Sequence, residues 1–540
     1  MRRTLAALLA LAAAPAIAGP VPAPAQSTTI AQSTTTQSTT PAQSTTPPQS
    51  SWPAPWFWTP PAPTLPGEPL AGYNAGSFYL RDPHNWFVLF PKGRLQIDWY
   101  NFLNRGDPPA GVDPNSAKDP RPKDTLFVRR VRPEIQGIIA NHFEFQLGGE
   151  FGTVPGVGQY GTLTDAFINV NYTPYLQLQV GQFDAPFTLE NRTSDKYFDF
   201  MERSLAVRAF GVPANKDDGG MLWGYFPNKL LYYSFGVFNG DGQGYKNQDN
   251  KPALIGRAFV APLAPWSRGR RWIEELWVGG SIWWQPNTNL GEASGVAPSV
   301  TGSTLNDLSS MTTQGGFGFF SSNYNNGTDA NKNPIRSHLA PNGDTLKWAV
   351  EANIPIWKLG ARFELVHQSI ALGQYNDSTN LMTASVVRTP GPVASGVLEG
   401  YGYYVELYGW LLGDRTMLEM PGIEPMPRLN RFVPAAEPKW GLMLAARYEH
   451  LGFNVNGLTP AGAKADPAQG DYSIDAVEVG LNAWLTKHVR LTCNYVLNYI
   501  GGFDAKATTD PANTDAANLK KNFFYGRGEH ELLFRAAVAL

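Results

Sequence analysis

The sequence predicts an all-β fold, a sixteen-stranded antiparallel transmembrane β-barrel, on three observations. Segments of about ten residues alternate between apolar and polar side chains, as strands with one lipid-facing side do. The connections between these segments are alternately long and short. No segment reaches the ~18 uninterrupted apolar residues of a membrane-spanning helix. Together these observations favour a membrane wall built from strands.

The N-terminus has the features of a secretory signal peptide over residues 1–18. Arg2 and Arg3 supply positive charge, residues 5–13 form a short apolar run, and the small-residue segment Ala-Ile-Ala at 16–18 predicts a cleavage site. We therefore expect the chain to be exported and this segment to be removed.

Residues 19–66 differ in composition from the rest of the chain. The repeat Gln-Ser-Thr-Thr begins at Gln26, Gln32, Gln37 and Gln43, and a stretch rich in Pro and Trp follows. Such a segment cannot bury a core, so we predict a disordered linker. A periplasmic tether is the alternative, with Trp side chains as anchors. Residues 67–92 are predicted to be a periplasmic lead-in, and 93–540 the barrel.

The period-two pattern defines the predicted strands. In the first strand, Leu95 and Ile97 alternate with Gln96 and Asp98. The sixteen predicted strands lie near 93–103, 125–140, 142–152, 162–172, 175–185, 218–226, 229–238, 252–262, 272–286, 344–355, 358–372, 398–412, 438–451, 471–485, 488–500 and 528–540. The residues expected to face lipid include Leu95, Trp99, Phe143, Leu491 and Val538.

Loop length separates the two ends of the predicted barrel. Connections after odd-numbered strands are long, as in 186–217 and 287–343, and those after even-numbered strands are mostly tight, as at Asn141. Only 413–437 departs from this rule by a wide margin. An even strand number with long loops on one side is typical of outer-membrane barrels.

Several short motifs resemble the phosphate-selective porin O and P family. The run FVRRVRPEIQG at 127–137 resembles the second strand of that family, and DAFI at 165–168, VGQFDAPF at 180–187, ENRTS at 190–194 and MERSL at 201–205 continue the resemblance. It extends over 90–540 and is most specific over 125–210. It implies a homotrimeric porin in the outer membrane of a Gram-negative bacterium, with loop 186–217 folded into the lumen.

The resemblance also implies an anion-binding constriction. The family has an arginine pair on the second strand, here Arg129 and Arg130, and a Ser, a Lys and an Arg on the inward loop, here Ser194, Lys196 and Arg203. Asp195 stands where the resemblance places the lysine, which we expect to weaken the site. Guanidinium groups suit this role because they stay charged and present a planar fork to oxyanions.

The predicted inner wall is mixed in charge, which leaves a weakly selective general diffusion porin as an alternative. Its predicted acidic side chains, twelve against nine basic ones, are Asp98, Glu134, Glu144, Glu150, Asp165, Glu275, Glu351, Glu364, Glu406, Glu449, Glu478 and Glu531. The basic ones are Arg94, Arg130, Arg132, Arg257, Lys347, Arg362, Arg447, Arg490 and Arg535.

A soluble, secreted, glycan-binding β-protein is a further alternative. It would need its Trp side chains on one exposed patch. Instead they fall near many strand ends, as in an interfacial girdle, at Trp99, Trp272, Trp284, Trp348, Trp410, Trp440 and Trp484.

Composition and motifs argue against other functions. A single cysteine, Cys493, excludes an intramolecular disulfide and a thiolate metal site. A net charge of −2 indicates no nucleic-acid partner. The seven His residues lie in no recognisable catalytic motif. The sequence thus predicts no enzyme, no cofactor and no metal. It predicts a porin for passive diffusion of small solutes, preferring anions such as phosphate, with outer-membrane lipid and small anions as partners.

Overall fold

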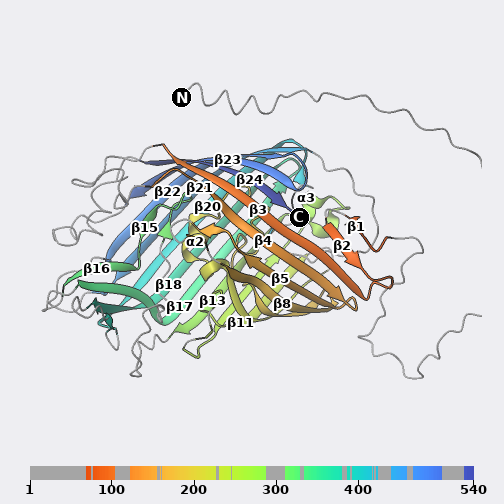
Figure 1. The fold of residues 1–540 in the computed structure, drawn as a ribbon. Helices are drawn as coiled ribbons and strands as arrows, with labels where there is room; N and C mark the ends of the chain where they lie inside the picture. The colour runs from red at the N-terminus through yellow and green to blue at the C-terminus, as the bar shows by residue number, and fades with distance from the viewer. Residues whose placement is uncertain are drawn as a thin grey trace, which may run out of the picture. The chain divides into compact units, whose positions relative to one another are not determined.

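Sixteen antiparallel strands form a closed ring in this computed structural model (Figure 1). The ring closes because the last strand pairs with the first, with Phe534 opposite Trp99. The strands are β3 (Phe87–Phe102), β4 (Thr125–Ile139), β5 (Phe143–Glu150), β8 (Thr162–Thr173), β9 (Leu176–Asp184), β10 (Lys216–Tyr225), β11 (Leu231–Phe238), β12 (Ala253–Val260), β13 (Trp277–Asn287), β17 (Pro334–Ile356), β18 (Leu359–Thr379), β20 (Ala394–Leu412), β21 (Gly441–Asn456), β22 (Gly470–Trp484), β23 (Val489–Gly501) and β24 (Glu529–Ala539). The predicted fold class and strand number are confirmed.

The structure describes residues 69–540 except 75–76, 104–121, 155–157, 160, 227–229, 245, 248, 288–310, 329–333, 380–385, 389–391, 416–417, 419–420, 424–439, 459–465, 467 and 502–527. The predicted signal peptide at 1–18 and the predicted linker at 19–66 lie outside the described residues.

The barrel is apolar outside and polar inside. On β3, Leu95, Ile97 and Trp99 are exposed, whereas Gln96 and Asp98 are buried. Leu491 and Val538 are likewise exposed, and Phe143 lies half-buried on the outer face against Tyr172. Successive strand residues point to opposite faces, so one alternating pattern supplies both the lipid-facing surface and the lumen.

The first barrel strand begins earlier than the sequence predicts. β3 starts at Phe87 rather than at residue 93, because β4 is long enough to pair with it as far as Phe87 opposite Ile139. The rest of the predicted lead-in forms a hairpin of β1 (Ala71–Asn74) and β2 (Ser77–Arg81). This hairpin pairs with β3 through Leu80 and Leu89, so it adds to the sheet instead of lying apart from it.

The connections contain short elements. They are β6 (Thr153–Val154), β7 (Gly158–Gln159), β14 (Met311–Thr312), β15 (Gly318–Phe320), β16 (Asn323–Thr328), β19 (Val386–Arg388), the helices α2 (Leu205–Phe210) and α3 (Arg271–Glu274), and the 3-10 turns η1 (Pro213–Asn215) and η3 (Ala264–Trp266). None of the helices in the described part of the chain is long and apolar enough to cross a membrane.

Two of the Trp residues predicted for an interfacial girdle lie inside instead. Trp410 and Trp484 are buried, with ring centroids 5.0 Å apart. Their positions along β20 and β22 share the inward face with Tyr408 and Asn482, so strand alternation decides their orientation. Trp99, Trp284, Trp348 and Trp440 are exposed, as a girdle requires.

Candidate functional site

The connection between β9 and β10, residues 185–215, is bound to inward-facing side chains of the wall; we call it the lumen loop. Its backbone N–H groups donate to Glu364 on β18, from Leu189, and to Glu449 on β21, from Leu205. Its carbonyls accept hydrogen bonds from two further strands: Phe198 O from Arg490 on β23 at 2.8 Å, and Gly211 O from Lys347 on β17 at 3.0 Å. None of these strands is a neighbour of β9 or β10 in the ring, so the contacts place this loop inside the barrel.

Helix α2 of the lumen loop is stabilised by an N-cap and by a buried apolar face. The Ser204 hydroxyl accepts a hydrogen bond from the N–H of Val207 at 3.4 Å, and the Glu190 carboxylate accepts from the N–H of Ser204 at 2.7 Å. Leu205, Val207 and Phe210 are buried among the wall side chains. This packing fixes the loop, so the charged residues that precede the helix have defined positions.

The arginine pair of β4 lies at a β-bulge. Gln96 is opposite Arg130 and Ile97 is opposite Val128, so Arg129 is an extra residue without a partner on β3. Adjacent strand residues normally face opposite sides of a sheet. The bulge lets both arginines turn to the lumen, where both reach Glu202 of the lumen loop, at 3.1 Å from Arg129 Nε and 3.6 Å from Arg130 Nη2.

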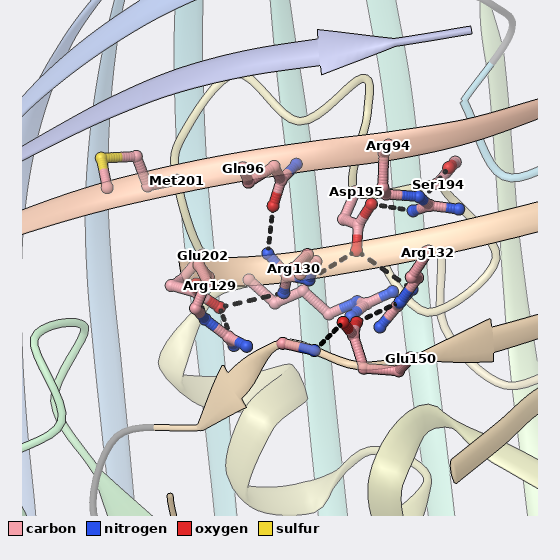
Figure 2. Close-up of polar contacts among 12 residues, drawn as sticks. Arg94, Gln96, Arg129, Arg130, Arg132, Glu150, Ser194, Asp195, Met201 and Glu202 are labelled. Carbon is pink, nitrogen blue, oxygen red and sulfur yellow. Dashed lines mark hydrogen bonds and ion pairs between the residues drawn. The ribbon is translucent and has the colours of Figure 1, made fainter. Parts of the chain in front are cut away.

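Asp195 is the meeting point of three further cationic contacts (Figure 2). Its carboxylate lies 2.9 Å from Arg130 Nε and 3.3 Å from Arg132 Nη1, and it also pairs with Arg94. Burial by itself raises the pKa of Asp195, but Arg94, Arg130 and Arg132 outweigh it and hold that pKa well below its usual value. The negative charge at the centre of the arginine cluster is therefore the Asp195 carboxylate of the lumen loop itself.

Glu202, further along the lumen loop, is a second carboxylate that pairs with several arginines. Arg535 of β24 forms an ion pair with Glu202 at 3.0 Å and another with Asp98 of β3 at 2.7 Å. Burial raises the pKa of Glu202, yet Arg129, Arg130 and Arg535 together hold that pKa well below its usual value. Arg129 and Arg130 are thus both neutralised by carboxylates of the lumen loop.

A cavity, here the first cavity, lies beside this network. Of the predicted site residues, Ser194, Lys196 and Arg203 line it, whereas Arg129 and Arg130 do not. Arg130 is only 4% exposed, because Asp195, Glu202 and Gln96 surround its guanidinium group. The structure therefore splits the predicted constriction into three cavity-lining residues and two that lie behind them.

Sequence reasoning did not place Arg94 and Arg132 in the site, although they line the first cavity. The signal was present, since Arg132 lies two residues from Arg130 on the same strand face and Arg94 is opposite Arg132 in the register. The lining has six basic side chains, Lys92, Arg94, Arg132, Lys196, Arg203 and Lys216, against four acidic ones, Glu134, Asp165, Asp184 and Asp195.

Most predicted acidic wall residues do not face open lumen. Glu364, Glu449 and Glu531 accept hydrogen bonds from lumen segments, with Gly315 N–H donating to Glu531 at 2.7 Å. Others pair with wall arginines, as Glu351 does with Arg257 at 2.7 Å. These carboxylates hold inserted segments in place, so the acidic excess of the wall does not describe the charge of the cavity.

Among the residues that the structure describes, no group of three or more His, Cys, Asp or Glu side chains is arranged to hold a metal ion.

Comparisons with known proteins give one family match. The family model of phosphate-selective porin O and P matches residues 110–293. No curated protein matches the chain. This family match contains the motifs at 127–137, 165–168, 180–187, 190–194 and 201–205, but it is shorter than the expected 90–540.

Solved outer-membrane proteins are similar at low identity. In-vitro folded OmpT, an outer membrane protein of Vibrio cholerae, is 10% identical with a TM-score of 0.43, and the alignment covers 84% of this chain and 98% of that one. An anion-selective porin from Comamonas acidovorans is 9% identical with a TM-score of 0.40, covering 84% and 100%. The outer membrane channel DcaP of Acinetobacter baumannii is 9% identical with a TM-score of 0.42, covering 84% of this chain and 97% of that one.

The segment with this family match runs through the bulge of β4, the lumen loop and the strands as far as β13. It contains every predicted site residue. Over residues 110–293, the chain is thus similar to the phosphate-selective porin O and P family.

Proposed function

We propose that this protein is an outer-membrane porin of a Gram-negative bacterium that lets small solutes diffuse passively and prefers anions. The observation that carries this proposal is the closed barrel whose lumen loop leaves a cavity with more basic than acidic lining residues. A wall with every strand paired and an apolar exterior suits a bilayer. A narrow passage lined by basic side chains favours anions.

The local charge of the passage matters more than the composition of the wall. Charges at ~4–6 Å from a permeating ion act through a low effective dielectric, whereas salt screens more distant ones over ~8 Å. Ser194 lies next to the same passage, with its Oγ 3.5 Å from Arg94 Nη1. We therefore propose Arg94, Arg132, Ser194, Lys196 and Arg203 as the anion-contacting set, with phosphate or related oxyanions as ligands.

A weakly selective general diffusion porin is the second candidate. The observation that favours it is the neutralisation of Arg129 and Arg130 by Asp195 and Glu202. In that case the arginine cluster is a structural support, and the passage discriminates mainly by size.

Reversal potentials in planar bilayers under a KCl gradient separate the two candidates. An anion-preferring porin gives a potential of the sign expected for chloride, and phosphate reduces its chloride current. A potential close to zero, together with no effect of phosphate, would favour the general diffusion porin. Cation preference would contradict the proposed selectivity.

The family match and the fold point to a channel rather than an enzyme. We accordingly propose that the barrel has no catalytic activity and that it assembles as a homotrimer. Native mass spectrometry of the detergent-extracted protein tests the oligomeric state.

A further inference from the structure

A second cavity lies next to the first, at the end of the barrel that has the tight turns. It is lined by the turn between β22 and β23, by the start of β23 and by the end of β24. Lys92, Lys196 and Tyr197 line both cavities. A solute that passes the lumen loop along β3 therefore meets the second cavity next.

The second cavity differs from the first in chemistry. Its basic lining residues are Lys92, Lys196, Lys487 and Arg490, and no acidic side chain is among the described residues that line it. Trp484, Tyr197 and the aliphatic end of β24 add an apolar part to the lining, and Ser77, Gln96 and His488 are its other members. The first cavity has four acidic side chains and only one aromatic, Tyr197.

Arg490 is incompletely satisfied in this position. It is only 4% exposed, and its Nη1 donates to the carbonyl of Phe198 at 2.8 Å. Its Nη2 has no hydrogen-bond partner among the residues that the structure describes. Its guanidinium carbon lies 5.6 Å from the ring centroid of Trp484. A buried cationic donor is costly when unpaired, so this group points to an anionic ligand.

We propose that the second cavity binds small organic carboxylates, with the carboxylate on Arg490 and the apolar body against Trp484 and Tyr197. A guanidinium fork matches the two oxygens of a carboxylate, and Lys487 adds a second positive charge. Aromatic faces stabilise an apolar body, which inorganic phosphate lacks. The inference rests on the proposed function, because the ligand reaches the cavity through the pore.

Block of the single-channel KCl current by benzoate, acetate and inorganic phosphate tests this site. We expect benzoate to reach half-block at a concentration roughly tenfold below that of acetate, because only benzoate buries a ring. Arg490→Gln should weaken benzoate block roughly tenfold, as expected for the loss of a charged hydrogen bond. Lys487→Gln, in a turn where folding is less at risk, should weaken it roughly two- to threefold.

Lys358→Gln is the matched control, since it removes a positive charge from the tight turn between β17 and β18 and lines neither cavity. It should leave benzoate block unchanged. Equal block by benzoate and acetate, or benzoate block that is insensitive to both Arg490→Gln and Lys487→Gln, would overturn the site.

Saturation-transfer NMR of benzoate with the full-length protein in detergent separates this proposal from the porin function. A signal that falls strongly in Arg490→Gln and less in Lys487→Gln, but is unchanged in Lys358→Gln, supports the site even if the protein conducts no ions. Absence of conductance would overturn only the porin function. Conductance without any benzoate signal would overturn only the site.

Discussion

Asp195 Oδ2 lies 2.9 Å from Arg130 Nε, although the two residues belong to different parts of the lumen wall, the loop and strand β4. The same carboxylate contacts Arg132 and Arg94. A phosphate ion in this position would have to compete with a carboxylate that is fixed there by the chain. Asp195 therefore sets how much positive charge the passage presents.

Replacing Asp195 with Asn should increase anion selectivity. The change removes one negative charge from the lining of the first cavity and leaves Arg94, Arg130 and Arg132 without their shared counterion. We expect the reversal potential in a KCl gradient to move toward the chloride limit and phosphate block to strengthen. Asp475→Asn, on the outer face of β22 beside His450, is the control and should change neither. A shift toward cation preference in Asp195→Asn would contradict this account.

The stability that Asp195 contributes should persist into acid. Its folded pKa is held well below the ordinary value of 3.8 by the three arginines, so the folded state binds fewer protons than the unfolded state near that pH. The contribution is fully present above the ordinary pKa and is lost as the pH falls through the lowered one. Thermal unfolding in detergent should show a constant difference between the wild type and Asp195→Asn from pH 7 to about 4.5, and a smaller one below about 3.8. A difference that stays constant below pH 3.8 as well would show that the pKa is not lowered.

Arg132→Gln should reduce anion preference more than Arg129→Gln does. Arg132 lines the first cavity, whereas Arg129 is directed to Glu202. Loss of Arg129 mainly removes a partner of a buried carboxylate and should lower the unfolding temperature. Bilayer reversal potentials, measured beside thermal melts of the same preparations, separate the two effects. Equal loss of selectivity in both variants would mean that Arg129 also faces the passage.

Glu364→Ala should loosen the lumen loop. The carboxylate accepts from the N–H of Leu189 and, at 3.3 Å, from the N–H of Glu190, and all three residues are buried. Each unsatisfied buried N–H costs roughly 1–3 kcal/mol, so the loop should leave this position part of the time and the current should become larger and noisier. Glu399→Ala, on the exposed outer face of β20, is the control. An unchanged single-channel trace in Glu364→Ala would show that the loop is held in other ways.

The fold could be predicted because strand alternation is a local signal that the bilayer enforces along each strand. The position of Leu95 outside and Gln96 inside follows from parity alone. The bulge at Arg129 does not, since it is an irregularity in the register with β3. Without it, parity turns only one arginine of the pair inward.

The ion-pair and hydrogen-bond partners of the charged side chains could not be predicted from the local sequence either. A count of the acidic and basic residues of the wall gives Glu364 and Arg94 equal weight. In the structure, however, the loop backbone covers Glu364, whereas Arg94 lines the first cavity. Contacts between residues far apart in sequence decide this difference. The sequence could therefore predict the inward loop and three residues that line the first cavity, but not which charged side chains lie behind them.

The hairpin of β1 and β2 has a consequence for how the barrel stays shut. β24 pairs with β3 only as far as Ala539 opposite Arg94, and β3 continues past that point to Phe87. There the hairpin takes over, pairing Leu80 with Leu89, and Tyr73 Oη lies 2.8 Å from His488 Nε2 in the turn between β22 and β23. An uncovered stretch of β3 would offer free amide and carbonyl groups to any neighbouring chain. The hairpin thus covers the seam where the first and last strands meet, and shields it from edge-to-edge aggregation.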